Sequence, residues 1–271
     1  MRYFLLGFLY IFINQSVRSQ FEDDFLIREK FFFEVGQIEE FQERFNFDGK
    51  TKLLKYLSDE QPELEINRKD LLVSLFDTSN ESFDPSLAEA FINNVNDSIN
   101  PYYLDFYDNG WYAEVYCIFE YNGNTDNGKL ILKNQFNPDS SSKWVIAGVS
   151  SALIKAPDSK DPLKTLSPVS HGTDFIALYD IMRDGDNIQN YIANDYPIDT
   201  LTCFISLVHN NKIRLKQIYK VKYHFLQIPK WVFTVDYFNR KELSSGWLIS
   251  SLIRVNKEEK KKYKADILKI Y

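Results

Sequence analysis

The sequence has little cysteine, glycine, proline or histidine, with 2, 10, 9 and 3 of these among its 271 residues. So few cysteines exclude a disulfide-dense scaffold, and stability must then come from a buried core. The scarcity of glycine and proline excludes a collagen-like or low-complexity chain. A net charge of −6 argues against a nucleic-acid partner, whose phosphates attract basic surfaces. Beyond the N-terminus no apolar run approaches the ~20 residues of a membrane-spanning helix.

Hydrophobic and aromatic residues are abundant instead. They make up 44% and 16% of the chain, with 22 Phe and 17 Tyr, which suffices for one large or two small cores. The charge is divided unevenly, because residues 20–154 carry a net −14 and residues 170–271 a net +5. Halves of opposite charge can attract each other or present different faces to partners.

The N-terminus has the layout of a secretory signal peptide. Arg2 precedes an apolar run over residues 3–13, and Val17 and Ser19 stand at the −3 and −1 positions of a cleavage site. We therefore predict a signal peptide at residues 1–19, cleavage after Ser19, and a periplasmic or extracellular protein. An uncleaved anchor or a buried first helix is the alternative.

A connector at residues 155–170 contains Pro157, Pro162 and Pro168 and divides the remaining chain. On each side of it, helical spacing of apolar residues gives way to alternation with period two. This order predicts an α+β protein of two domains, at 20–154 and 171–271, each with helices packed on a curved antiparallel sheet. Strands are expected at about 111–120, 129–136 and 143–153, and again at 213–227, 231–238 and 246–255.

The two halves also resemble each other. Residues 131–149 align with residues 234–252 without a gap, so that Trp144 and Ile146 meet Trp247 and Ile249 at an offset of 103. An internal duplication is one explanation. Shared apolar periodicity between two unrelated α+β domains is the other.

Helices followed by a meander of long strands resemble the nuclear-transport-factor-like fold of ketosteroid isomerases and polyketide cyclases, which implies a cone-shaped cavity. The second half is also similar to uncharacterised exported proteins of diderm bacteria. That resemblance covers about the last 100 residues and implies no known activity. It rests on Ser170-His-Gly-Thr-Asp-Phe175, Tyr223-His-Phe-Leu-Gln-Ile228 and Ser245-Gly-Trp-Leu-Ile-Ser250.

Two near-matches to catalytic motifs fail. Gly123 to Leu130 nearly forms a phosphate-binding loop, but Leu130 replaces the hydroxyl that would bind magnesium, and a hairpin turn within 122–128 is favoured. Gly148-Val-Ser-Ser-Ala152 nearly forms a nucleophile elbow, but Ala152 stands where the sharp turn needs glycine. No cofactor is indicated.

The histidines and cysteines do not suggest a metal centre. His171, His209 and His224 have no further ligand at metal-binding spacing. His209 is expected at a helix end, and His224 on a solvated strand face with lysines. Cys117 and Cys203 are interpreted as buried apolar residues, with a disulfide between them as an alternative.

Three residues are candidates for acid–base chemistry. His171 and Asp174 lie three apart at a predicted helix start, where they can orient a general base or simply cap the helix. Asp236 shares a strand face with Val232 and Thr234, and apolar neighbours would raise the pKa of its carboxyl group.

Aromatic side chains are the candidates for ligand binding. Trp231 follows Pro229 at a strand start and is expected to be the most exposed tryptophan, and Tyr223 is a second candidate. The basic segment 257–264 predicts a solvated terminal helix, or alternatively a contact with an anionic surface.

Three hypotheses about function follow. The first is an exported, non-enzymatic protein that binds a small apolar ligand or an envelope protein. The second is an isomerase- or dehydratase-like enzyme that uses Asp174 or Asp236 as its base. The third is a structural protein that assembles through its oppositely charged halves.

Overall fold

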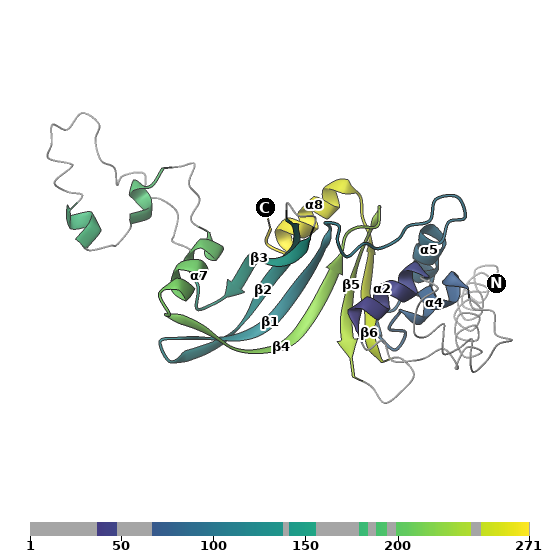
Figure 1. Cartoon of the computed structure of the whole chain (residues 1–271), viewed down its shortest axis with the longest axis horizontal. Coiled ribbons are helices and arrows are strands. Elements are labelled where there is room, and N and C mark those ends of the chain that lie inside the picture. Colours follow the sequence, from purple (N-terminus) through teal and green to yellow (C-terminus); the bar gives the residue numbers. More distant parts are fainter. Residues whose placement is uncertain are drawn as a thin grey trace, which may run out of the picture.

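A computed structural model describes residues 37–47, 67–137, 141–155, 179–183, 188–193, 199–239 and 245–270 (Figure 1). The fold is α+β, as predicted, with helices packed on an antiparallel sheet. In chain order the elements are α2 (Ile38–Asn46), α4 (Arg68–Ser74), α5 (Pro85–Val95), β1 (Trp111–Tyr121), β2 (Asn124–Phe136), β3 (Ser142–Ser151), the 3-10 helix η2 (Ile188–Tyr191), α7 (Thr200–His209), β4 (Ile213–Phe225), β5 (Trp231–Phe238), β6 (Gly246–Arg254) and α8 (Lys257–Asp266).

Side-chain caps define where several helices begin. The Asp84 carboxylate accepts hydrogen bonds from the first turn of α5, and Pro85 occupies the first helical position, a residue pair that favours a helix start. Helix α4 begins at Arg68, because Asn67 caps it and exchanges hydrogen bonds with Asp70 in a capping box.

A tight hairpin connects β1 and β2. Asn122 and Gly123 form its two-residue turn, with φ angles of 50° and 79°, a combination that favours Asn-Gly. The predicted turn within 122–128 is confirmed but shorter, because β2 already starts at Asn124.

One sheet contains strands from both halves of the chain. Its order is β3-β2-β1-β4-β5-β6, so two three-stranded meanders meet where β1 pairs with β4. Adding 103 to the bounds of β1, β2 and β3 gives 214–224, 227–239 and 245–254, which overlap β4, β5 and β6. This mirrored order is consistent with the hypothesis of an internal duplication.

Helices cover one face of this sheet, which we call the helix face. On this face the helices of each half of the chain pack on strands of the other half. Helices α2, α4 and α5 from the first half lie against β5 and β6, whereas α7 from the second half packs over β1, β2 and β3 (Figure 1). In the first core, Phe91 of α5 contacts Trp231 and Phe233 of β5. In the second, Phe204 of α7 contacts Phe119 of β1.

The predicted division into two separate domains is not confirmed, nor is a cone-shaped cavity. Each core combines helices of one half with strands of the other, and β1 pairs with β4 along its whole length. The physical reason is that an apolar stripe specifies that a helix is buried, but not which strands bury it.

The opposite face of the sheet, the tail face, is partly covered by the C-terminal helix α8. Leu268 is fully buried against Tyr112, Ile131 and Val232. The ammonium group of Lys260 donates hydrogen bonds to two backbone carbonyls, at Leu226 and Ile228. The segment 257–264 is therefore a helix, as predicted, but the half-buried Lys260 and Tyr263 and the buried Leu268 that follows anchor it to the sheet.

Two glycines, Gly128 on the helix face and Gly148 on the tail face, test how closely each face of the sheet packs. A Cβ at Gly128 would lie 2.6 Å from the Phe119 ring and 2.8 Å from the Ser150 carbonyl oxygen, whereas one at Gly148 would meet nothing closer than 3.6 Å. Gly128→Ala is therefore expected to lower the free energy of unfolding by ~1–3 kcal/mol. Gly148→Ala should change it by less than ~0.5 kcal/mol. Urea unfolding of both variants checks this, and equal losses would contradict the packing described.

Candidate functional site

Charged and hydrogen-bonding side chains concentrate on the tail face. Alternation along the strands brings Glu114, Lys222 and Asp236 into one cross-strand row, and Tyr116 and Lys220 into the next. We call the full set the ion network: Glu114, Tyr116, Lys129, Lys220, Lys222, His224, Asp236, Ser250 and Tyr263.

Glu114 is the centre of the network. Its carboxylate accepts hydrogen bonds from Lys129 Nζ (2.7 Å) and the Tyr116 hydroxyl (2.9 Å), and it lies 3.2 Å from His224 Nε2. Burial alone would raise the pKa of Glu114, but these three donors outweigh burial and lower the pKa from 4.5 to about 2. Glu114 is therefore a fixed anion at neutral pH.

His224 connects the sheet to α8. An ionised carboxylate only accepts hydrogen bonds, so Nε2 carries the imidazole proton and Nδ1 accepts from the Tyr263 hydroxyl at 2.8 Å. Burial, followed by the charge of Glu114, raises the pKa of Tyr263 to about 12. His224 is only 2% exposed, so the prediction that it is solvated is wrong, because α8 covers its strand face.

Asp236 lies among cations rather than apolar groups. Its carboxylate is 2.7 Å from Lys220 Nζ and 3.4 Å from Lys222 Nζ, and it accepts a hydrogen bond from the Ser250 hydroxyl at 2.6 Å. The oxygen facing Lys220 forms this close ion pair but accepts no well-aligned hydrogen bond. These contacts correct the expected apolar environment, because the facing strands supply lysines that the spacing within β5 does not reveal.

A cavity of about 290 Å³ opens beside the network, and we call it the sheet-face cavity. Ile131 and Ile267 form apolar walls, and Val149, whose side chain is buried in the core on the helix face, also lines the cavity. Its polar lining consists of Glu114, Lys129, Ser150, Asp266 and Lys269, from β1, β2, β3 and the end of α8. Glu114 is almost enclosed, with 6% of its side chain exposed, whereas Lys129 exposes 44%.

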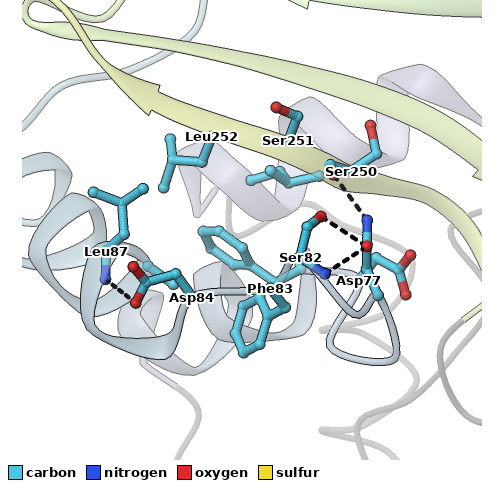
Figure 2. A pocket seen from close by; sticks show the side chains of 12 residues that line it. Asp77, Ser82, Phe83, Asp84, Leu87, Ser250, Ser251 and Leu252 are labelled. Atoms are coloured by element: carbon cyan, nitrogen blue, oxygen red, sulfur yellow. Dashed lines mark hydrogen bonds between the residues drawn. The ribbon is translucent and has the colours of Figure 1, made fainter.

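A second hollow, between β6 and the segment that leads into α5, is too small for a ligand. Figure 2 shows Phe83, Leu87 and Leu252 around it, and its volume is only about 40 Å³, close to that of a single water molecule. Its polar groups are occupied, since Asn80 donates to the Ser250 carbonyl and accepts from Ser82.

The two aromatic candidates lie on the helix face. Trp231 is buried in the first core, where its Nε1 donates to Asn94, so the prediction that it is exposed is wrong. The start of β5 lies beneath α5, which the adjacent Pro229 does not reveal. Tyr223 is half-buried between Trp111, Trp144 and Trp247, and burial raises the pKa of its hydroxyl.

His171 and Asp174 lie outside the described residues, and the remaining candidates are not part of this site. His209 ends α7, as predicted. Cys117 and Cys203 are both free, so the alternative of a disulfide is not realised.

Glu114, Lys129 and Tyr263 were not predicted as members of one network. Glu114 alternates with apolar residues along β1, which is also the pattern of a solvated strand face. Glu120 on the same strand follows this pattern and forms a surface ion pair, so alternation alone does not single out Glu114.

No protein-family model, curated protein or solved structure matches the chain. In the described part of the chain, no cluster of His, Cys, Asp and Glu has the geometry to hold a metal ion. No described helix is long and apolar enough to cross a membrane.

Proposed function

We propose that this protein is exported and binds, without chemical turnover, a small molecule with an apolar body and one negatively charged group. The sheet-face cavity carries the proposal. It joins apolar walls to two ammonium groups in about 290 Å³, close to the lower size of ligand pockets.

The ligand chemistry follows from the lining. Ile131 and Ile267 favour an apolar body, and Lys269 favours a negative group. Lys129 compensates the charge of Glu114, and Tyr116 and His224 also hydrogen-bond this carboxylate, so Glu114 repels an incoming anion only weakly. Asp266 remains at the rim and disfavours ligands with several negative charges.

The same contacts argue against an enzymatic reaction at this site, whereas Asp174, the other candidate base, lies outside the described residues. A general base needs a pKa near the working pH, and the pKa of Glu114 is about 2. Asp236 is engaged with Lys220, Lys222 and Ser250, so it has no free access to a substrate proton. The network therefore suits a rigid wall of a binding site better than a reacting group.

Export and a cell-envelope location are part of the proposal. They are supported by the signal-peptide layout of residues 1–19 and by the resemblance of the second half to exported bacterial proteins with nuclear-transport-factor-like domains. The proposed ligand is one form of the small apolar ligand considered from the sequence.

Binding of anilinonaphthalene sulfonate, an apolar ring system with one anionic group, tests the proposed function. We expect its fluorescence to rise with the full-length protein, and Ile267→Asp to weaken its affinity at least ~10-fold, about 1.4 kcal/mol. Ile267 lines the cavity and is 52% exposed, so the fold tolerates the change. The matched control is Ile99→Asp, at an 83% exposed residue away from the cavity. No enhancement, or equal losses in both variants, would contradict the proposal.

A further inference from the structure

The two edge strands of the sheet, β6 and β3, differ in the backbone hydrogen bonds that they make to the rest of the chain. At the β6 edge the segment after α4 forms a bridge to Ile249, with hydrogen bonds from Asp77 N to Ile249 O and from Ile249 N to Leu75 O. At the other edge lies β3, which pairs with β2 on one side. Between Lys143 and Ser150 its backbone makes no other hydrogen bond to any part of the chain that the structure describes.

The open β3 edge has few of the features that normally prevent pairing with another strand. It contains no proline and one charged residue, Lys143. Trp144 and Ile146 are 39% and 45% exposed beside this edge. A register shift opposite Ile131 and Leu132 bends the strand near Ala147, which favours pairing along part of the edge rather than its whole length.

A cavity of about 290 Å³ follows the second part of this edge, and we call it the edge slot. Consecutive β3 residues form one wall, the first turn of α7 the opposite wall, and Lys269 lies at the rim. The β3 wall is made mostly of small side chains, which leaves the backbone accessible. The full lining is Ala147, Gly148, Val149, Ser150, Ser151, Ile154, Asp199, Thr200, Leu201 and Lys269.

We propose that the edge slot binds an extended peptide segment of a partner protein, which adds as a strand to β3 and places a carboxylate on Lys269. Free backbone groups at strand spacing are satisfied best by another extended backbone, which is the basis of strand addition. Val149, Ile154 and Leu201 provide apolar contacts for alternate side chains of the peptide.

The charged residues that line the edge slot favour a peptide that carries a carboxylate. Of the two charged residues that line it, Asp199 is committed to capping α7, where its carboxylate accepts from the Thr202 backbone and hydroxyl. Lys269 forms no ion pair with any described residue. An acidic side chain or a C-terminal carboxylate of the peptide therefore complements the open cation.

The walls argue for a peptide over a second copy of this chain. The edge slot lies between α7 and the C-terminal turn at Lys269, so it has room for a single strand. The edge of another sheet, with its own covering helix, would collide with both walls. Self-association through β3 is the outcome that would contradict this choice.

Selection from a displayed library of random heptapeptides with free C-termini, against the full-length protein, tests the proposal. We expect enriched peptides of alternating apolar character with an acidic or C-terminal carboxylate. The enriched peptides are then synthesised, and alternate N-methylation, which removes backbone donors, should weaken their binding at least ~10-fold. Absence of enrichment, or equal binding of the N-methylated peptides, would overturn the proposal.

A matched pair of variants locates the binding. Ala147→Lys places a long charged side chain in the slot, a change of the kind that protects natural edge strands. Ala152→Lys makes the same change at an exposed residue just beyond β3 and should leave peptide affinity unchanged. Thr200→Lys, on the α7 wall, is the second slot variant in case Ala147→Lys fails to fold.

The readouts separate this inference from the ligand site and from self-association. The edge slot and the sheet-face cavity share Lys269, so no variant of Lys269 is used. Ala147 and Thr200 line the edge slot alone, so their variants should retain anilinonaphthalene sulfonate binding. Equal peptide affinity in wild type and slot variants would contradict the assignment. Concentration-dependent dimerisation in light scattering, lost in Ala147→Lys, would assign the edge to a second copy instead.

Discussion

Phe91→Ala is expected to lower the free energy of unfolding by ~3–5 kcal/mol, the range for removing a fully buried aromatic side chain. The Phe91 ring is 0% exposed and lies 5.3 Å from the Trp231 ring and 5.5 Å from the Phe233 ring, measured between centroids. Because α5 belongs to the first half and β5 to the second, the loss should destabilise both halves together. Urea unfolding followed by tryptophan fluorescence and by circular dichroism should therefore show one transition at lower urea.

The control is Phe136→Ala at a side chain that is 46% exposed, where the change should stay within ~0.5 kcal/mol. Two separate transitions, of which Phe91→Ala shifts one, would contradict the exchange of helices between the halves. That result would restore the two-domain interpretation.

Acid is expected to destabilise the protein through Glu114. The pKa of Glu114 is about 2 in the folded protein, against its ordinary 4.5, so the unfolded chain binds the proton more readily. The stabilisation is complete above pH 4.5 and disappears as the pH falls from 4.5 to about 2. The shift corresponds to about 3 kcal/mol of unfolding free energy.

Urea unfolding of the wild type and Glu114→Gln between pH 2 and 7 measures this contribution. At pH 7 the variant should be less stable by about 3 kcal/mol, and the two curves should converge near pH 2. Glu120→Gln is the control, since Glu120 forms a surface ion pair with Lys216 and should follow the wild-type curve. Parallel curves for the wild type and Glu114→Gln would show that the ion network does not carry this dependence.

Short-range features of the fold were predictable because the interactions that cause them lie close together in the chain. Asp84 and Pro85 start α5 through bonds within one turn, and Asn122-Gly123 forms a turn that needs positive φ at both residues. Strand positions followed from alternation, which is also local. The offset of 103 between the halves matches the chain order of the strands, but it did not predict that both sets join in one sheet.

The candidate site was less predictable because its members come from distant elements. Glu114 and His224 are 110 positions apart, and Asp236 meets its lysines across strands. The register between β1 and β4, which brings Glu114 opposite Lys222, depends on how the two meanders join. Nothing in the local pattern of either strand specifies that pairing.

By itself the sequence determined most of the apolar core, the positions of the strands, the cap of α5 and the mismatches that exclude the two catalytic motifs. Only the tertiary structure decided that helices are exchanged between the halves, that Trp231 is buried, and that α8 encloses His224. The reason is that periodicity states whether a side chain is buried, whereas its partner is chosen by packing across the whole sheet.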